Sequence, residues 1–325
     1  MDFSLLTTEI VGQPLWIWGG FFIFIIALLV FDLGVLNRKD HEVTFKESLK
    51  LSSFYISLAL LYGIFIYFYV ENGPERAALY YTVYFLEESL SMDNIFVMSI
   101  IFSYFAIPRE YQHRVLFWGI IGVIVFRFIM IGAGTAIIAQ FEWLLFLFAL
   151  LLIWTGYKIL TGQDTEFNVS DSKLYKFIMG HFNVSPQIQG NRFFVKEEQN
   201  GKLVRRMTPL FVALIIIEMA DLIFALDSIP AALAITQDTY VIYTANIFAI
   251  LGLRALYFVL AALVHRFEYL KYALSLVLIF IGLKVFYSHF VGHVHPTLSL
   301  AITVGTLLGG LVFSLLKTKN SENQQ

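Results

Sequence analysis

Long apolar runs separated by short polar connectors dominate the pattern of the chain. A helix that spans a bilayer needs about 20 mostly apolar residues. Nine segments meet this requirement: roughly residues 15–36, 48–70, 78–105, 114–139, 142–161, 209–234, 240–264, 268–287 and 297–316. Lipid offers no hydrogen-bond partner to an open backbone, so each segment is expected to be helical. The pattern predicts an all-α polytopic membrane protein with about nine transmembrane helices.

The composition agrees with this class. Hydrophobic residues make up 58% of the 325 residues and charged residues 14%, whereas soluble domains have about 45–50% and about 25%. The chain has no Cys, which excludes disulfides, iron–sulfur clusters, thiolate zinc sites and a Cys nucleophile. The apolar run after Pro14 is too long for a signal peptide and follows no Lys or Arg, so it is expected to be a retained first span.

Lys and Arg are distributed unevenly between alternate connectors. One set of connectors holds only Arg76. The other set holds seventeen: Arg38, Lys39, Lys46, Lys50, Arg109, Arg114, Lys173, Lys176, Arg192, Lys196, Lys202, Arg205, Arg206, Arg266, Lys271, Lys317 and Lys319. Short loops rich in these residues stay in the cytosol. The distribution predicts an amino terminus outside the cytosol and a carboxyl terminus inside it.

The connector over residues 162–207 is the only long one. It begins with apolar residues at helical spacing: Leu174, Phe177 and Ile178. This spacing suggests a short amphipathic helix at the membrane surface. Further on, Asn200-Gly201 between two strand-like runs is a strong hairpin signal. We expect a structural or regulatory role for this connector.

Two parts of the chain resemble each other. The paired positions are Phe141-Glu-Trp-Leu with Phe267-Glu-Tyr-Leu, Gly156-Tyr-Lys158 with Gly282-Leu-Lys284, Arg127 with Arg254, and Asp93-Asn94 with Asp227-Ser228. The offsets are 126, 127 and 134 residues. Units that start three spans apart have opposite orientations, so the pattern indicates a 3+3 inverted-topology repeat. Similar composition of apolar helices is the alternative, but it does not explain matching charges.

The repeat divides the chain into five parts. Residues 1–77 hold two amino-terminal spans, and residues 78–161 and 208–288 are the two three-helix units. Residues 162–207 form the cytosolic connector, and residues 289–325 form the last span and tail. In transporters, inverted repeats place the substrate site near the bilayer midplane.

Carboxylates interrupt two of the predicted spans. One stretch runs from Glu87 to Asn94, and the other runs from Glu218 to Pro230. An ionisable group at mid-membrane costs about 2.5–3.5 kcal/mol on insertion scales, so such residues are read as functional. Glu87 and Glu218 each lie nine residues from the start of their spans, which enter from opposite sides. They are expected to reach a similar depth, about 13 Å at 1.5 Å per residue, and therefore to meet near the middle of the membrane.

So many acids exceed what two mid-span Arg residues neutralise. Either some carboxylates stay protonated, or a cation binds. The ligand candidates are Glu87, Asp93, Asn94, Glu218, Asp221 and Asp227. Supporting residues are Ser89, Ser91, Ser228, Arg127, Arg254 and Pro230, whose missing N–H frees a backbone carbonyl. Oxygen ligands suit Mg²⁺, Ca²⁺ or Mn²⁺, whereas Zn²⁺ and Cu prefer imidazole or thiolate.

Several alternatives stay open. A structural ion-pair network would use the same acids and Arg residues. Asp221 and Asp227 are six residues apart, about 120° from facing the same way on a regular helix, so either the helix breaks or each faces a different neighbour. Glu88 points about 100° from Glu87 and has less weight. Asp32 is expected at the membrane interface. A histidine cluster on the outer side can bind metal, sense pH, or form a solvated loop: His289, His293 and His295.

These residues resemble the TerC family of integral membrane proteins, close to its Alx branch. The resemblance rests on three stretches: Glu87-x-Ser89-Leu90-x-x-Asp93-Asn94-x-Phe96-Val97, Asp221-x-Ile223-Phe224-Ala225-x-Asp227-Ser228-Ile229-Pro230-Ala231, and Asn246-Ile-Phe-Ala-Ile-Leu-Gly-Leu-Arg254. It covers residues 16–313. It implies a bacterial inner-membrane protein linked to manganese export and metal homeostasis, with some relatives named for tellurite resistance.

The expected function is therefore export of Mn²⁺ from the cytosol, with protons as counter-ion. Mn²⁺ is the transported substrate; no resident cofactor and no nucleic-acid partner is expected. Rivals are transport of Ca²⁺ or another cation, and a scaffold in metal or tellurite stress that transports nothing. An enzyme is not expected, because the predicted spans contain no His or Cys.

Overall fold

The structure is a computed structural model that describes residues 9–10, 13–31, 43–161, 169–199, 202–261 and 269–322. Inside these ranges, the side chains of some residues are not described: 9–10, Asp93, Asp171, Gln199, Lys202 and 318–322. The expected positions of Asp32 and of the Phe267-Glu pair also lie outside the described residues.

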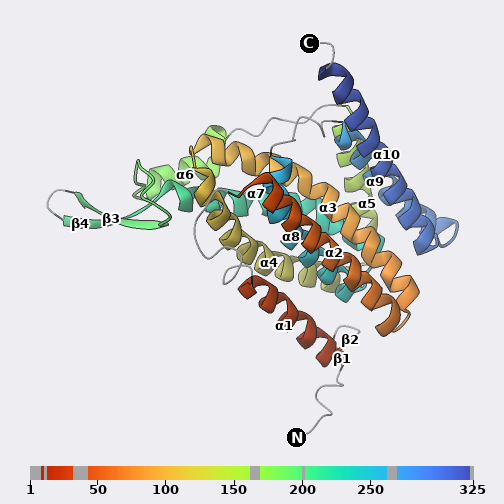
Figure 1. The fold of residues 1–325 in the computed structure, drawn as a ribbon. Helices are drawn as coiled ribbons and strands as arrows, with labels where there is room; N and C mark the ends of the chain where they lie inside the picture. Colours follow the sequence, from red (N-terminus) through yellow and green to blue (C-terminus); the bar gives the residue numbers. More distant parts are fainter. Residues whose placement is uncertain are drawn as a thin grey trace, which may run out of the picture.

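Helices account for most of the described chain (Figure 1). The α-helices are α1 (Leu15–Phe31), α2 (Phe45–Tyr69), α3 (Gly73–Tyr104), α4 (Arg109–Gln140), α5 (Leu144–Leu160), α6 (Lys173–His181), α7 (Pro209–Ile235), α8 (Thr239–Leu260), α9 (Leu270–Phe290) and α10 (Pro296–Glu322). A 3₁₀ turn, η3 (Val169–Asp171), precedes α6. Each of the nine expected apolar segments falls on a helix.

Six of these helices are long and apolar enough to cross a membrane: α2, α4, α7, α8, α9 and α10. Two more apolar helices, α1 and α5, have 17 residues each. Helix α3 has 32 residues but carries Glu87, Glu88 and Asp93 in its apolar run. The chain is therefore a polytopic helical membrane protein, and membrane crossing by all nine segments stays a prediction.

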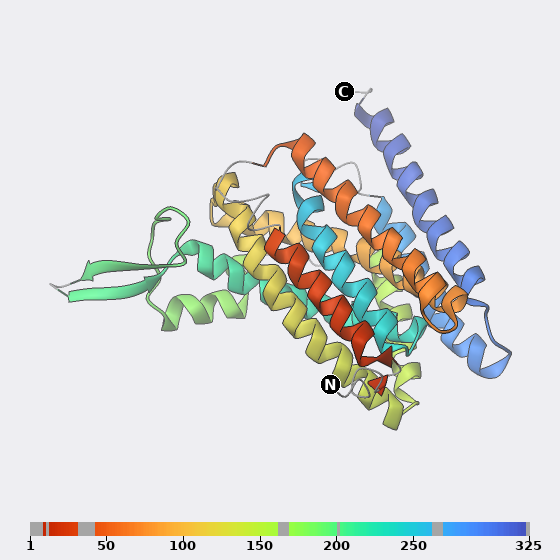
Figure 2. The same cartoon turned by 60° about the horizontal axis from the view of Figure 1, so that its bottom comes forward.

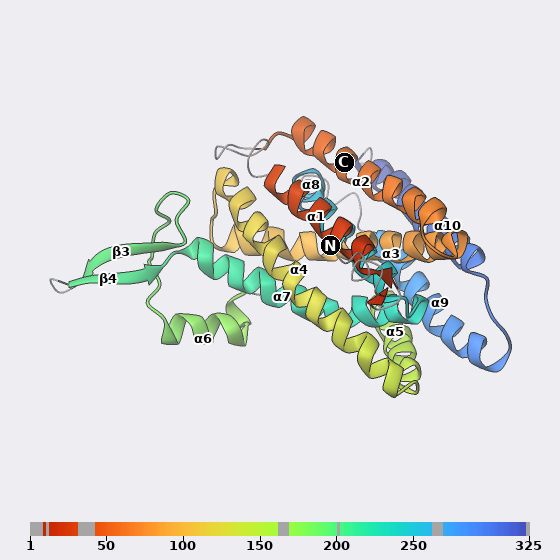
Figure 3. The same ribbon diagram turned by 90° about the horizontal axis from the view of Figure 1, so that it is seen from below.

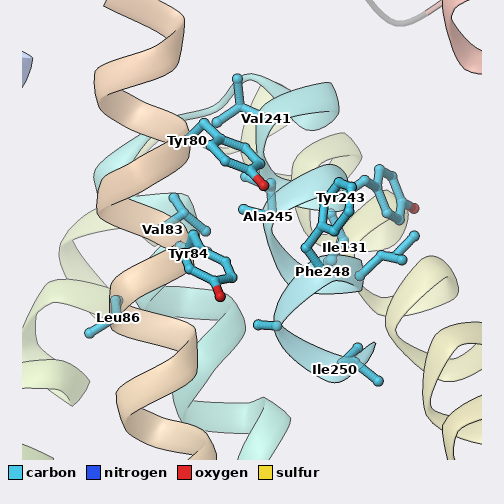
Figure 4. Close-up of a cluster of buried hydrophobic side chains, with 14 of the residues drawn as sticks. Tyr80, Val83, Tyr84, Leu86, Ile131, Val241, Tyr243, Ala245, Phe248 and Ile250 are labelled. Carbon is cyan, nitrogen blue, oxygen red and sulfur yellow. The ribbon is translucent and has the colours of Figure 1, made fainter. Parts of the chain in front are cut away.

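Helix α8 lies at the centre of the bundle (Figures 2 and 3). It packs against α2, α3 and α4. In its most apolar stretch of 18 residues, 89% of the residues are buried. Figure 4 shows Tyr80 and Tyr84 of α3 pointing toward α8, where Phe248 contributes to the same cluster of buried side chains. Asp238 caps the amino end of α8, since its Oδ1 accepts from the backbone N–H groups of Tyr240 and Val241.

Further helix contacts join one predicted repeat unit, α3–α5, to the other, α7–α9. Helix α4 packs against α7, α3 against α7, and α5 against α9. The α5–α9 contact is close because of glycines on both helices. A Cβ atom at Gly156 would lie 2.7 Å from the Ser275 carbonyl oxygen, and one at Gly282 would lie 2.6 Å from the Ala149 carbonyl oxygen. Only glycine permits these two backbone approaches.

The connector between α5 and α7 forms a hairpin and a helix, which project from the end of the bundle where α7 begins (Figure 1). Strands β3 (Phe194–Gln199) and β4 (Lys202–Met207) pair antiparallel, with Gln199 opposite Lys202, so the predicted hairpin is confirmed; its turn at 200–201 lies outside the described residues. Two strands of two residues each form another short pair at the amino end, β1 (Glu9–Ile10) with β2 (Gln13–Pro14).

The expected apolar face of α6 is only partly correct. Ile178 is buried and Leu174 is half-buried, but Phe177 is 52% exposed and stacks on His181. The inner face uses Tyr175 instead, whose ring lies edge-on to Tyr104 at the end of α3. Tyr175, which packs against α3, therefore takes the inward position that the helical spacing had assigned to Phe177.

Candidate functional site

A buried guanidinium connects four helices at the centre of the site. Arg127 of α4 donates from Nη1 to Oε1 of Glu87 on α3 and, at 2.5 Å, to Oδ1 of Asn246 on α8. Its Nη2 lies 3.5 Å from Oδ1 of Asp221 on α7. The same oxygen of Asp221 accepts from Nδ2 of Asn94 on α3 at 3.2 Å. We call these five residues the central network.

The central network is almost completely removed from solvent. None of its side chains belongs to a residue more than 4% exposed. Asn246 is fixed further by the helix itself, since its Nδ2 donates to the Ile242 carbonyl at 3.1 Å. Attraction between unlike charges is strong in such an environment, but the desolvation of each ion opposes it. Each buried charge therefore depends on its partners in the network for compensation.

Several polar atoms of the central network have no hydrogen-bond partner among the described residues. These are Oε2 of Glu87, Oδ1 of Asn94 and Nε of Arg127. Two oxygen acceptors and one N–H donor thus remain in a region with little solvent access. Buried polar groups are normally satisfied, so exceptions call for an explanation such as a ligand or a functional movement.

Helix α7 directs its two aspartates to different neighbours. Asp221 joins the central network, whereas Asp227 is half-buried and lies 3.4 Å from the Thr155 hydroxyl of α5. The helix is continuous from Pro209 to Ile235 and contains Pro230. Of the two alternatives for residues six apart, α7 therefore shows different facing directions along an unbroken helix.

Two further glutamates lie against glycines of neighbouring helices. The Glu218 carboxyl occupies the space where Gly122 of α4 would carry a Cβ, and it also lies beside Gly119. The Glu88 carboxyl lies beside Gly252 of α8. Within the described residues, both oxygens of each carboxyl are buried without a hydrogen-bond partner. The predicted approach of Glu218 to Glu87 is not among the contacts of the described residues.

The supporting residues are dispersed. Ser89 bonds back to the Phe85 carbonyl of its own helix, and Ser91 and Ser228 are buried. Arg254 lies over the Phe117 ring, 5.8 Å from its centroid. Asp93 has no described side chain, so its predicted ligand role stays a prediction.

Asn246 is the member of the site that the sequence reasoning did not propose as a ligand. It is a neutral amide within an apolar run, so it adds no charge that would mark the segment. The available signal was its place at the start of the stretch from Asn246 to Arg254, the third of the stretches that resemble the TerC family.

Metal-binding geometry is not assembled from acids and histidines alone. Within the described ranges, no group of three or more His, Cys, Asp or Glu side chains is placed to hold a metal ion. The three histidines near the junction of α9 and α10 have different surroundings. His289 lies edge-on to Phe146, and His295 lies 2.7 Å from the Thr297 hydroxyl. His293 lines a pocket that also contains Glu75. A cation at the centre would need amide as well as carboxylate oxygens.

Comparison with known proteins identifies the family. The model of the integral membrane protein TerC family matches residues 72–322. The chain belongs to the TerC family. This match includes every residue of the central network, and the family resemblance predicted from the three stretches is confirmed.

Relatives of this TerC-family chain come from several bacteria. It is 51% identical over 300 residues to a membrane protein of Rickettsia felis, which covers 92% of this chain and 97% of the relative. It is 44% identical over 311 residues to a membrane protein of Myxococcus xanthus, covering 96% and 95%. It is 39% identical over 305 residues to Alx of Escherichia coli, described as a candidate membrane-bound redox modulator, covering 92% and 93%. No solved structure matches the chain.

Proposed function

We propose that this TerC-family protein exports Mn²⁺ from the cytosol through the central network, with protons as the counter-ion. The observation that carries the proposal is the convergence of Glu87 and Asp221, from two different helices, on a single guanidinium. Together with Asn94 and Asn246, they offer carboxylate and amide oxygens, which suit Mn²⁺, Mg²⁺ and Ca²⁺. The choice of Mn²⁺ among these ions comes from the family resemblance.

Proton exchange follows from the burial of the acids. A carboxylate that loses its cation in a low-dielectric site is costly, and protonation removes the charge. Because Arg127 neutralises one of the two carboxylates, the Glu87–Asp221 pair would bind one proton when the metal leaves and release it when the metal returns. This alternation would couple the two ions without a separate proton site.

The second part of the proposal is an inverted repeat of α3–α5 and α7–α9. Exchange of the two units turns the α3–α8 contact into the α4–α7 contact, and both contacts are present. The close α5–α9 approaches support the same relation, since Gly156 and Gly282, and likewise Ala149 and Ser275, are 126 residues apart. Such repeats allow alternating access by rocking of one unit against the other.

The third part is the placement in the bacterial inner membrane, with nine spans, the amino terminus outside and the carboxyl terminus in the cytosol. The absence of Cys makes this directly measurable. An impermeant maleimide should label Glu142→Cys in spheroplasts, and should label Leu203→Cys only after permeabilisation; both positions are exposed. The reverse pattern would contradict the orientation.

Transport is tested in liposomes that contain the purified protein. Mn²⁺, Ca²⁺ and lumenal pH are followed for wild type, Asp221→Asn and the matched control Asp238→Asn, which keeps an N-cap residue at the outer face. Loss of a metal-site residue should lower Mn²⁺ flux by at least about 10-fold, whereas the control should keep the wild-type rate.

The outcomes separate the rival functions. Flux of Ca²⁺ without Mn²⁺ would favour a different cation as substrate. Absence of flux for any cation in the wild type would contradict transport and favour a scaffold. Redox modulation, suggested by the description of Alx, cannot use thiol–disulfide exchange here because the chain has no Cys.

A further inference from the structure

Arg127 occupies the position toward which the oxygens of the central network converge. The acceptors come from three helices, and the guanidinium comes from a fourth. Nη1 donates hydrogen bonds to Glu87 Oε1 and Asn246 Oδ1, and Nη2 forms an ion pair with Asp221 Oδ1. Viewed as ligands, these acceptors are two carboxylate oxygens and one amide oxygen, a set that hard divalent cations prefer. The guanidinium nitrogens thus stand where a metal ion would find its ligands.

Two unused acceptors add to this set. Oε2 of Glu87 and Oδ1 of Asn94 belong to residues that are 1% and 4% exposed, and neither atom has a hydrogen-bond partner in the part of the chain that the structure describes. Both residues already contact the network through their other polar atom. The guanidinium therefore uses only part of the available oxygens, and a smaller ion with more coordination positions could use the rest.

The attachment of Arg127 permits movement. Among the described residues, its Nε has no hydrogen-bond partner, and its contacts are made through the two Nη groups. With both carboxylates ionised, Arg127 leaves a net charge of one negative unit. A divalent ion that replaces the guanidinium neutralises both carboxylates, whereas a monovalent ion only exchanges one positive charge for another.

We propose that Arg127 is a tethered substitute for the transported cation: it fills the oxygen set in the metal-free protein and is displaced by divalent but not by monovalent ions. This inference rests on the proposed transport function and names the residue that sets its valence selectivity. Arg127 acts by competing for Glu87 and Asp221, and it does not ligate the metal.

The test measures the thermal midpoint of the purified full-length protein as Mn²⁺ or Na⁺ is added, for wild type, Arg127→Gln, Arg127→Lys and the control Arg76→Gln. Removal of the competitor should raise the apparent Mn²⁺ affinity by about 10-fold, within the usual range of coupling between two ligands. It should also make Na⁺ stabilising, which it is not in the wild type. Arg127→Lys, with a single ammonium, should show a smaller gain and covers the case in which Arg127→Gln does not fold.

Unchanged or weaker Mn²⁺ binding in both Arg127 variants, with normal binding by Arg76→Gln, would overturn the inference. Wild-type flux in liposomes keeps this failure distinct from failure of the proposed function. If the wild type transports Mn²⁺ but the variants gain no affinity, Arg127 is only a structural partner. If the wild type neither binds nor transports a divalent cation, both proposals are wrong.

Discussion

Two arginine–carboxylate pairs join α3 or α4 to other helices, and they differ in how completely the carboxylate is satisfied. At the amino end of α8, Arg76 Nε lies 2.9 Å from Asp238 Oδ2. The other oxygen of Asp238 accepts from two backbone N–H groups at the start of α8. In the central network, Glu87 and Asp221 share one guanidinium, and Glu87 Oε2 has no partner among the described residues.

The difference follows from where each acid lies on its helix. The first N–H groups of a helix have no partner within it and can satisfy a carboxylate. In the middle of a helix every N–H is already used, so Glu87 and Asp221 depend on side chains or on a bound ion. We infer that the Arg76–Asp238 pair is a structural element and that the central network is held ready for a ligand. Four substitutions test this contrast.

The largest loss of stability is expected for Arg127→Gln without divalent cations. Removing one partner of a buried ion pair leaves the other charge unpaired and costs about 3–5 kcal/mol. Thermal midpoints in nanodiscs, with a chelator present, measure the effect. A midpoint no lower than that of Arg76→Gln would contradict the contrast between the two regions.

A smaller loss is expected for Asn246→Ala. It removes the amide that accepts from Arg127 at 2.5 Å, and a hydrogen bond to a charged group contributes about 1.5–3 kcal/mol. Thr244→Ala on the same helix is the control, since its hydroxyl bonds back to the Tyr240 and Val241 carbonyls of its own helix. If both variants lose equal stability, packing of α8 rather than the network explains the effect.

For Asp238→Ala, loss of the helix cap should cost about 0.5–2 kcal/mol. Asp238→Asn keeps a capping oxygen and should recover most of this loss, although it lacks the charge. Comparison of the two midpoints separates capping from ion pairing. Equal losses in both variants would show that the charge of Asp238, rather than its capping oxygen, stabilises this end of α8.

The smallest effect is expected for Arg76→Gln. Ion pairs near the water boundary contribute about 0–1 kcal/mol and weaken with salt. The wild-type and variant midpoints should therefore converge as NaCl is raised. A loss comparable with that of Arg127→Gln would remove the distinction on which the other predictions depend.

The helical segments and the hairpin were predictable because each depends on local signals. Apolar runs of sufficient length define the helices, and Asn200-Gly201 between strand-like runs defines the hairpin. The segment ends differed by only a few residues; for example, α7 was expected at 209–234 and ends at Ile235. The pairing of Glu87 with Arg127 was among the alternatives left open, since both lie in mid-span.

Side-chain facing was harder to predict because it depends on how each helix is rotated about its axis. Spacing alone gave two possibilities for Asp221 and Asp227, and packing of α7 between α4 and α5 decided between them. Glu218 was expected to meet Glu87, but the glycines of α4 provide space for its carboxyl on another side. Asn246 was missed because a single amide leaves the hydrophobic pattern unchanged.

The connection between the hairpin and α7 has a practical consequence. The Thr208 hydroxyl donates to the Arg192 and Phe193 carbonyls, and the Thr208 N–H also bonds Phe193, so the base of the hairpin is fastened to the first turn of α7. The hairpin is therefore expected to move together with α7, the helix that carries Asp221. A spin label or fluorophore at Leu203, which is 73% exposed, would magnify small rotations of α7 into displacements that spectroscopy can follow.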